Sequence, residues 1–136
     1  MCAVLTVHAQ SVSSVGSPYI QSNKIEQQLR QAQLYYNENS FYLSQTMLRE
    51  IISNPQSTDV QRREAAALLA VITYELDAAT GGETIEAYLR DYPDAPDKNR
   101  MKALMLLSSY ARHDFDAVTK GMNDVDPDQL NAKERD

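Results

Sequence analysis

The chain has 136 residues, enough for one domain with a hydrophobic core, and its 43% hydrophobic and 24% charged residues are typical of a globular protein. Its net charge of −6 argues against nucleic-acid binding, because the phosphate backbone attracts basic surfaces. The single cysteine, Cys2, excludes a disulfide within the chain and a site with several thiolates, and no apolar run reaches the roughly 18 residues of a membrane span.

The first 22 residues are predicted to be a signal-peptide remnant followed by a flexible linker. Residues 1–10 are mostly apolar and uncharged, and Val7-His8-Ala9 has the small-residue spacing of a signal-peptidase site. Residues 11–18 are rich in serine and glycine, as linkers are. These features predict export by a Sec-type signal to the periplasm or cell envelope. The alternative is an apolar N-terminus that is simply frayed.

Helical periodicity begins at Asn23. The apolar stripe of the first helix comprises Ile25, Leu29, Ala32 and Tyr36. Asn39-Ser40 interrupts this pattern, and a second helix begins at Phe41, with an inward stripe of Ser44, Leu48, Ile51 and Ile52. Asn54-Pro55 ends the second helix, because the residue before a proline disfavours the helical conformation.

A third helix is predicted over residues 59–78. Thr58 and Gln61 have the spacing of a capping box, which marks a helix start. Residues 65–72 are almost entirely apolar, which is typical of a helix that is buried on most sides. Thr80-Gly81-Gly82 is expected to break this helix, and a fourth helix over residues 83–91 is expected to end at Tyr92-Pro93.

Two further helices and the start of another are predicted near the C-terminus. Asp94 is expected to cap a helix over residues 96–112, and His113-Asp114 is expected to separate it from a helix over residues 115–124. Asp126-Pro127-Asp128-Gln129 combines an acidic N-cap, a proline at the first position and a glutamine at the third. This motif predicts the start of a capping or fourth-repeat helix over residues 127–136.

A repeat of about 37 residues organises these helices. Tyr36, Tyr74 and Tyr110 lie near the ends of the first, third and fifth helices, 38 and 36 residues apart (74 − 36 = 38; 110 − 74 = 36). Regular spacing of helix–turn–helix units indicates an all-α superhelix, or solenoid. We therefore predict about three repeats, at about residues 23–57, 58–95 and 96–126.

The pattern of residues 23–136 resembles the tetratricopeptide repeat (TPR) family. That family has small residues where its paired helices approach closely, and the matching residues here are Ala32, Ala70, Ser44 and Gly82. Leu106 and Val118 depart from this pattern in the third repeat, and the repeat exceeds the family's usual 34 residues. The segment Tyr-Leu-x-x-Tyr-Pro-Asp-Ala-Pro at residues 88–96 is similar to a turn of Gram-negative envelope TPR proteins, the outer-membrane-assembly lipoproteins and periplasmic cell-division coordinators.

The resemblance implies a non-enzymatic scaffold that binds a peptide or partner protein on the concave face formed by the first helix of each repeat. By position, the residues implied on this face are Tyr36, Tyr74, Tyr110, Gln33, Asn37, Glu64, Glu75 and Arg100, with apolar steps at Leu29, Val71 and Leu107. The alternative is that each tyrosine only packs between neighbouring first helices. A second functional hypothesis is an N-terminal capping segment of a longer solenoid, because the first helix is polar.

Two other clusters are weak candidates for chemistry. The triplet Asp124, Asp126 and Asp128 has the spacing of the first calcium ligands of a loop, but Gln129 stands where that loop needs glycine. His113 precedes two aspartates, but a histidine at a helix end is commonly a solvated turn residue. We therefore expect no enzyme activity, no cofactor and no metal.

Overall fold

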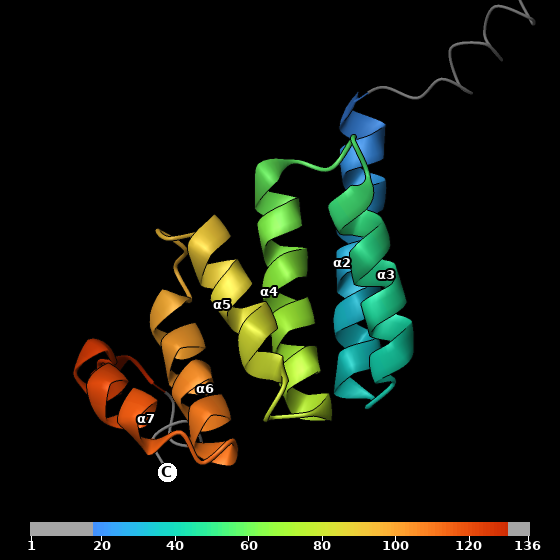
Figure 1. The fold of residues 1–136 in the computed structure, drawn as a ribbon. Coiled ribbons are helices and arrows are strands. Elements are labelled where there is room, and N and C mark those ends of the chain that lie inside the picture. Colours follow the sequence, from blue (N-terminus) through green and yellow to red (C-terminus); the bar gives the residue numbers. More distant parts are fainter. Residues whose placement is uncertain (1–17, 131–136) are drawn as a thin grey trace, which may run out of the picture.

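The computed structural model describes residues 18–130, and this part of the chain is helical without a β-strand (Figure 1). The elements are α2 (Pro18–Asn37), α3 (Phe41–Ser53), α4 (Asp59–Leu76), α5 (Gly81–Asp91), α6 (Lys98–Ala111), α7 (Phe115–Gly121), and the short 3₁₀ helices η1 (Met122–Asp124) and η2 (Pro127–Gln129). The prediction of an all-α protein is confirmed for these residues. The proposed signal segment lies outside the described residues. Among the described helices, none has the length and apolar character needed to cross a bilayer.

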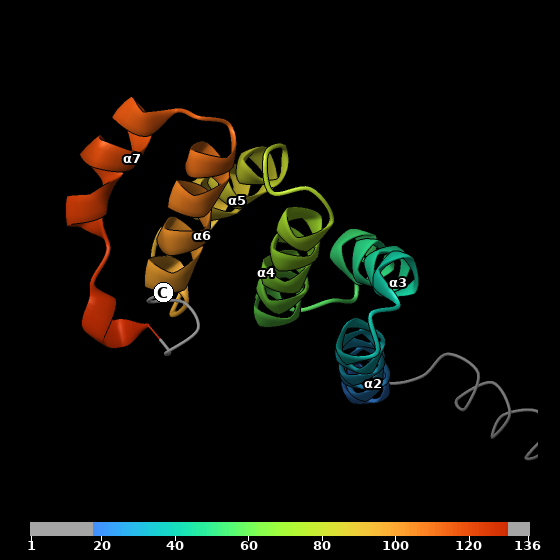
Figure 2. The ribbon, with the colours of Figure 1, turned by 90° about the horizontal axis from the view of Figure 1, so that it is seen from below.

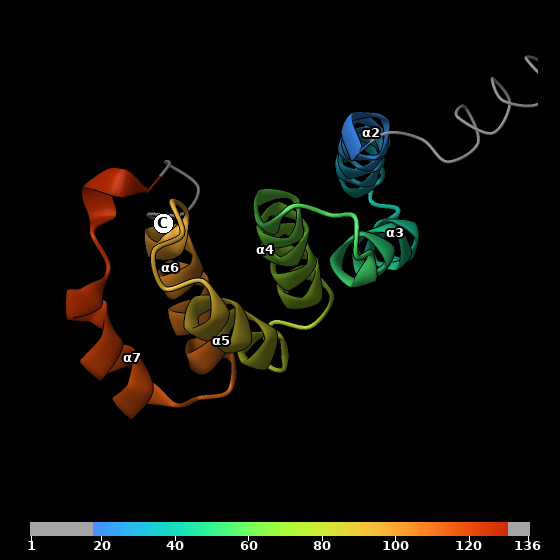
Figure 3. The ribbon, with the colours of Figure 1, turned by 90° about the horizontal axis from the view of Figure 1, so that it is seen from above.

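Consecutive helices pack as antiparallel pairs, α2 with α3, α4 with α5 and α6 with α7. Figures 2 and 3, which look along the helices, show α2, α4 and α6 on one side of the molecule and α3 and α5 on the other. Helix α4 lies in the middle and contacts α2, α3, α5 and α6. This arrangement gives α2, α4 and α6 a shared surface.

The core consists of two clusters that meet at α4. The first cluster contains Ile25, Leu29, Ala32, Leu48, Ile51, Ala65 and Ile72, and the second contains Ala70, Val71, Ile85, Tyr88, Ala95, Met101 and Leu104. Helix α4 contributes to both clusters, so its apolar residues 65–72 are buried or half-buried. The prediction that this helix is buried on most sides is confirmed.

The predicted start of α4 is confirmed in detail. The Thr58 hydroxyl accepts a hydrogen bond from the Gln61 amide (3.1 Å), and the Gln61 side-chain oxygen accepts one from the Thr58 amide (2.9 Å). Both donors would otherwise be unsatisfied at the helix N-terminus. The Gln61 side-chain nitrogen also donates to the Ser22 carbonyl (3.0 Å), which joins the start of α4 to α2.

The small residues predicted where paired helices approach closely are buried, but only some of them make that contact: Ser44 meets Ala32 within the first pair, whereas Gly82 faces Ser108 of α6. Ser44 is fully buried and donates its hydroxyl hydrogen bond to the Ala32 carbonyl (2.8 Å), so α3 lies directly against the backbone of α2. The third pair achieves close contact differently, because Leu106 packs on Gly121 of α7. The larger residue therefore lies on α6 and the small residue on α7, which explains why Leu106 departs from the pattern of the first two repeats.

The expected break between the third and fourth helices is present, but it lies at residues 77–80, before Gly81 and Gly82. Both glycines are buried in the first turn of α5. A Cβ atom on Gly81 would lie 2.5 Å from the Tyr74 Cα, and one on Gly82 would lie 2.5 Å from the Ser108 Oγ. The two glycines therefore allow α5 to approach α4 and α6, which is a tertiary requirement that outweighs their low helix propensity.

Two other predicted helix starts also differ. Helix α2 begins at Pro18 instead of Asn23, because proline is well tolerated in the first turn of a helix, where its missing N–H costs nothing. Helix α6 begins at Lys98 with Asp97 at the N-cap, so Asp94 does not cap it. Asp97 makes no capping hydrogen bond either, since its carboxylate accepts one from Tyr88.

The predicted helix at residues 127–136 is only the short η2 within the described residues. Asp126 caps η2 by accepting from the Asp128 amide (3.0 Å), and the Gln129 side chain donates to the other Asp126 oxygen (2.7 Å). Leu130 is extended and buried, so the helix ends there. The predicted helix at residues 115–124 similarly divides into α7 and η1. Residues 131–136 lie outside the described part of the chain.

Candidate functional site

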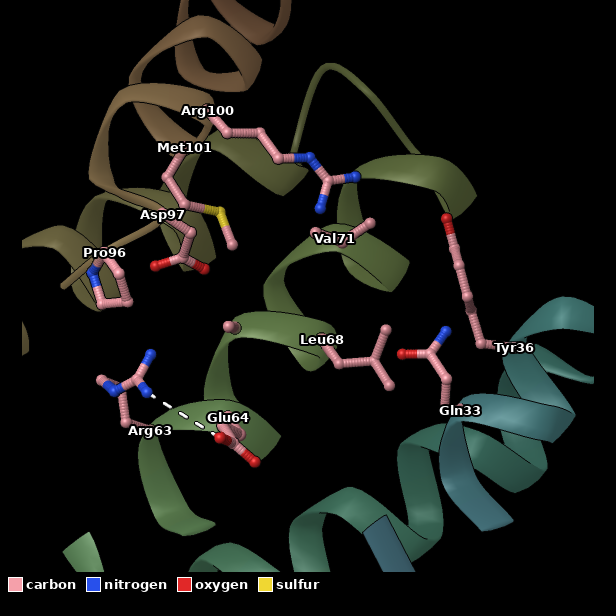
Figure 4. Close-up of a pocket in the computed structure, with 11 residues that line it drawn as sticks. Gln33, Tyr36, Arg63, Glu64, Leu68, Val71, Pro96, Asp97, Arg100 and Met101 are labelled. Carbon is pink, nitrogen blue, oxygen red and sulfur yellow. Dashed lines mark ion pairs between the residues drawn. The ribbon is translucent and has the colours of Figure 1, made fainter. Parts of the chain in front are cut away.

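An open groove of about 570 Å³ crosses α4 between α2 and α6 (Figure 4). The residues that line it are Gln33, Tyr36, Arg63, Glu64, Ala67, Leu68, Val71, Pro96, Asp97, Arg100 and Met101. They come from α2, from α4, and from the end of the α5–α6 connection and the start of α6, because these three helices share one side of the molecule. We refer to this feature as the α4 groove.

The α4 groove has an apolar floor and polar walls. Figure 4 shows Leu68 and Val71 on α4, between Arg100 and Met101 on one side and Tyr36 on the other. Glu64 is exposed near one end of the groove, where its carboxylate lies 3.9 Å from the guanidinium of Arg63. The groove therefore offers a strip that can bury apolar side chains, flanked by charged and hydrogen-bonding groups of both signs.

Two smaller hollows extend the α4 groove at its ends. A hollow of about 300 Å³ at the α2–α3 turn is lined by Tyr36, Asn37, Asn39, Phe41 and Glu75. A hollow of about 250 Å³ at the α5–α6 connection is lined by Arg63, Tyr92, Pro93, Asp94, Ala95 and Pro96. The first shares Tyr36 with the groove, and the second shares Arg63 and Pro96. The two smaller hollows therefore adjoin the α4 groove at these shared residues.

Tyr36 connects α2 to α4 at one end of the groove. Its hydroxyl donates a hydrogen bond to Glu75 Oε1 (3.0 Å). Partial burial, followed by the hydrogen bond and negative charge of Glu75, raises the pKa of Tyr36, while the positive charge of Arg100 opposes this increase. The tyrosine is therefore a neutral donor at the groove wall and not an acid that ionises near neutral pH.

Tyr88, on α5, forms a hydrogen bond to a residue at the other end of the groove. Its ring is buried, and its hydroxyl donates a short hydrogen bond to Asp97 Oδ1 (2.6 Å). Burial and Asp97 both raise the pKa of Tyr88, while Arg63 acts in the opposite direction. One hydroxyl on α5 thus holds the charged groove residue at the N-cap of α6.

The structure brings some of the predicted site residues together and separates others. Gln33, Tyr36, Glu64, Val71 and Arg100 line the groove, while Asn37 and Glu75 line the hollow next to it. Within α2, the Gln33 side chain donates to the Asn37 side chain (3.1 Å).

The remaining predicted residues lie elsewhere. Tyr74 is half-buried against the second core cluster, and Leu29 is buried in the first. Tyr110 and Leu107 are exposed on α6, and the Tyr110 ring packs edge-on against Phe115 (centroids 5.7 Å apart). Neither residue lines the groove.

Sequence reasoning missed about half of the groove lining, chiefly Arg63, Ala67, Leu68, Asp97 and Met101. A signal for two of the missed residues existed, because Arg63 and Ala67 lie eight and four residues before the predicted Val71 and so share its face of the helix. Asp97 carried no comparable signal, since the sequence gives it the pattern of a residue at a helix start.

The acidic clusters have local structural roles. Asp126 caps η2, and Asp114 caps α7 by accepting from the Ala117 amide (3.1 Å). His113 is exposed in the turn before α7, and its ring lies 6.0 Å from that of Phe115. Across residues 18–130, His, Cys, Asp and Glu form no group of three or more that could hold a metal ion.

The groove is therefore an elongated surface with an apolar floor and walls that carry both positive and negative groups. The hydroxyls of Tyr36 and Tyr88 form hydrogen bonds at its two ends. Comparison of the chain with models of protein families, with curated proteins and with solved structures found no match.

Proposed function

We propose that the chain is a non-enzymatic interaction module of the TPR type, which binds a peptide segment or partner protein along the α4 groove. The observation that carries the proposal is the open α4 groove between α2 and α6, with its apolar floor, its charged walls and the two hollows that adjoin it. An open groove suits an extended chain, whose apolar side chains enter the floor while polar groups at the walls set the register.

The proposal of a TPR-like solenoid is supported by the way the structure repeats. Three antiparallel pairs follow one another, and small residues lie at close contacts within or between the pairs, as at Ser44 and Gly82. The turns after α2 and α6 also share one conformation, with Asn39 and His113 in the left-handed region at φ 60° and 62°. Repetition of a unit in both sequence and backbone is the property from which solenoids are built.

A first experiment tests the groove with a selected ligand. A peptide library displayed on phage is selected against the intact chain, and the affinity of each selected peptide is measured for two charge-reversed variants. Arg100→Glu changes the groove wall, whereas Arg49→Glu makes the same change on the exposed face of α3. We expect Arg100→Glu to weaken binding by about tenfold, corresponding to roughly 1.4 kcal/mol, and Arg49→Glu to have little effect.

The floor of the groove supplies a second, independent variant. Ala67→Arg places a long side chain over Leu68 and Val71, and because Ala67 is only half-buried the helix can accommodate it. Circular dichroism and thermal unfolding establish that each variant is folded. Equal binding by the parent chain, Arg100→Glu and Ala67→Arg would show that the peptides bind elsewhere and would refute the groove as the site.

We further propose that the protein acts in the bacterial cell envelope. This part of the proposal rests on the signal-like residues 1–10 and on the turn at residues 88–96. Mass spectrometry of the protein from fractionated native cells tests it. We expect a periplasmic or envelope fraction and an N-terminus created by cleavage after Ala9. An unprocessed protein in the cytoplasmic fraction would contradict the location and leave the groove proposal unaffected.

A second candidate function is that of a capping segment in a longer helical array. It is favoured by the outward face of α2, where Lys24, Gln27, Arg30 and Gln31 are all exposed. A terminal repeat needs such a polar outer face, since no neighbour covers it. The same mass measurement tests this candidate, which predicts a native protein longer than 136 residues with further helical repeats after α7.

A further inference from the structure

Asp97 is held by a neighbour instead of by its own helix. It is the N-cap residue of α6, a position where an aspartate side chain commonly accepts a hydrogen bond from an amide of the first turn. It makes no such bond, because its Oδ1 accepts from the hydroxyl of the buried Tyr88 across 2.6 Å. The carboxylate is therefore fixed at the groove wall by a group outside α6, and departures from local helix chemistry are expected at functional positions.

The carboxylate of Asp97 is presented to the α4 groove. Asp97 is half-buried and lines the groove, and Figure 4 shows its carboxylate pointing into the groove on the side where Arg63 lies. Within residues 18–130, Asp97 forms no ion pair with Arg63 or with another basic side chain. The hydrogen bond from Tyr88 thus orients a carboxylate that no cation of the described chain neutralises directly.

The end of the groove around Asp97 carries an excess of negative charge. Glu64 and Asp97 line the groove here, and Asp94 lines the adjoining hollow. Arg63 is the basic residue shared by the groove and that hollow, and its guanidinium lies 3.9 Å from the carboxylate of Glu64. Three carboxylates and one guanidinium leave a formal charge of −2 at this end (−3 + 1 = −2).

The opposite end of the groove is balanced in charge. Figure 4 shows Arg100 extending over Val71 toward Tyr36, and the positive charge of Arg100 lowers the pKa of that tyrosine against the effect of Glu75. One guanidinium and one carboxylate give a formal charge of zero (+1 − 1 = 0). A positively charged group of a ligand is therefore attracted to the Asp97 end in preference to the Tyr36 end.

We propose that Asp97 binds the side chain of a lysine or arginine in the peptide that occupies the α4 groove, and that Tyr88 is the positioning residue for this carboxylate. The inference rests on the proposed function of the groove and adds a chemistry and a direction to it. The basic residue of the peptide lies beside Pro96, and its apolar residues continue over Leu68 and Val71.

A basic residue fits this end better than an acidic one. An acidic side chain would meet the like charges of Asp97 and Glu64, while the guanidinium of Arg63 already has Glu64 as its partner. The methylene stem of a lysine or arginine can also cover the apolar ring of Pro96 while its charged end reaches the carboxylate. Because Tyr88 already fixes Asp97, binding requires little further ordering of that side chain.

The test uses peptides selected from a random phage-displayed library on the parent chain. Those whose binding Ala67→Arg weakens are retained as groove ligands, since Ala67 lies in the groove. We expect them to share a lysine or arginine at a constant spacing from an apolar residue. Replacement of that lysine by norleucine, or of that arginine by citrulline, removes the charge and should weaken binding to the parent chain about tenfold.

The variant Asp97→Asn identifies the residue that recognises this charge. It keeps an oxygen that can accept from Tyr88 but has no negative charge, so the charged and uncharged peptides should differ by no more than about twofold on it. Asp116→Asn is the same change at an exposed position of α7 and should preserve the tenfold difference.

The variant Tyr88→Phe tests the positioning role. It leaves the charge of Asp97 but removes the hydrogen bond that orients it. Binding of the charged peptide should weaken about threefold, and binding of the uncharged peptide should not change. A general disturbance of the groove would weaken both peptides equally. Circular dichroism and thermal unfolding establish the temperature at which all the variants are folded.

The possible failures are distinguishable. Groove ligands that share no basic residue, or that share an acidic one, would overturn the inference and leave the groove function intact. The same holds if the tenfold difference persists in Asp97→Asn, or if Tyr88→Phe weakens both peptides equally. If the selection gives no peptide whose binding depends on Ala67, the groove function is refuted and this inference with it.

Discussion

The hydroxyl of Tyr36 on α2 donates to the carboxylate of Glu75 on α4 across 3.0 Å, although the two residues are 39 positions apart. This hydrogen bond lies where the α4 groove meets the hollow at the α2–α3 turn, and Tyr36 lines both. It is also the contact that is missing at the equivalent Tyr110 of the third pair, whose side chain is mostly exposed. One interaction therefore joins α2 to α4 at the wall of the groove.

We predict that Tyr36 and Glu75 are energetically coupled. Tyr36→Phe and Glu75→Gln should each lower the free energy of unfolding by about 0.5–1 kcal/mol, because the hydrogen bond is exposed to solvent. The double variant should cost less than the sum, since both changes remove the same bond. Urea unfolding of the four proteins measures the coupling. Tyr35→Phe is the matched control on the same helix, and strictly additive losses would show that the contact has no energetic role.

Local side-chain chemistry made some features of the fold predictable from sequence. The capping box of Thr58 and Gln61 involves residues three apart, so it can be recognised without knowledge of the rest of the fold. The same holds for the end of α3, where Asn54 precedes a proline and adopts an extended conformation. The small residue at Ser44 was also predicted at a close helix contact, and it donates to the Ala32 carbonyl.

Features that depend on two distant segments were not predictable in this way. Gly81 and Gly82 have the pattern of a helix break, but the positions of Tyr74 and Ser108 make them necessary inside a helix. Asp97 has the pattern of a capping residue, but its carboxylate accepts a hydrogen bond from the Tyr88 hydroxyl instead of from the start of the helix. The α4 groove could not be predicted for a related reason. Periodicity identifies the residues that share a helix face, but it does not identify the space between two helices.

The three glycines at helix contacts should tolerate alanine to different degrees. At Gly81 the new Cβ would meet the backbone of Tyr74, which cannot rotate away, so Gly81→Ala should be the most destabilising, by about 2–3 kcal/mol. At Gly82 the obstacle is the Ser108 side chain, and we expect a loss of about 1–2 kcal/mol. At Gly121 the obstacle is the end of the flexible Leu106 side chain, so Gly121→Ala should be nearly neutral.

Thermal unfolding of the three glycine variants measures this order. All three glycines lie at helix ends, the first two residues of α5 and the last residue of α7, so the difference of about 1 kcal/mol between alanine and glycine in a helix interior does not set the ranking. The decisive pair is Gly81 and Gly121. Equal stability of these two variants would mean that α5 moves away from Tyr74 at little cost, contrary to the tight packing described above.

Tyr88 should make stability sensitive to alkaline pH. Its folded pKa is raised above the ordinary value near 10 by burial and by Asp97, so its stabilising contribution is complete below pH 10 and is lost as the pH rises through the folded pKa. Tyr36 and Tyr74, whose pKa values are also raised by partial burial, act in the same direction. The free energy of unfolding should therefore fall as the pH rises above about 10.

Tyr88→Phe isolates the contribution of one hydroxyl. At neutral pH the variant should lose about 1–2 kcal/mol, because the short hydrogen bond to Asp97 is partly buried. Between pH 9 and pH 11 its stability should decline less steeply than that of the parent chain. Urea unfolding across this range gives both values, and Tyr42→Phe, on the exposed face of α3, is the control. Parallel pH profiles for parent and Tyr88→Phe would exclude Tyr88 as the source of the decline.

The segment after α7 should depend on Asn99 for its attachment to α6. The Asn99 side-chain nitrogen donates to the Asp126 carbonyl (2.8 Å), and its oxygen accepts from the Asp126 amide (2.7 Å), so one side chain satisfies both backbone groups of that residue. Asn99→Ala removes both bonds and should accelerate amide hydrogen exchange at residues 122–130 by about tenfold, with little change in α2–α5. Lys98→Ala, at the neighbouring exposed position, should leave this exchange unchanged. Uniform acceleration throughout the protein would mean that the segment supports the whole fold, whereas unchanged exchange would mean that the buried Leu130 alone holds it.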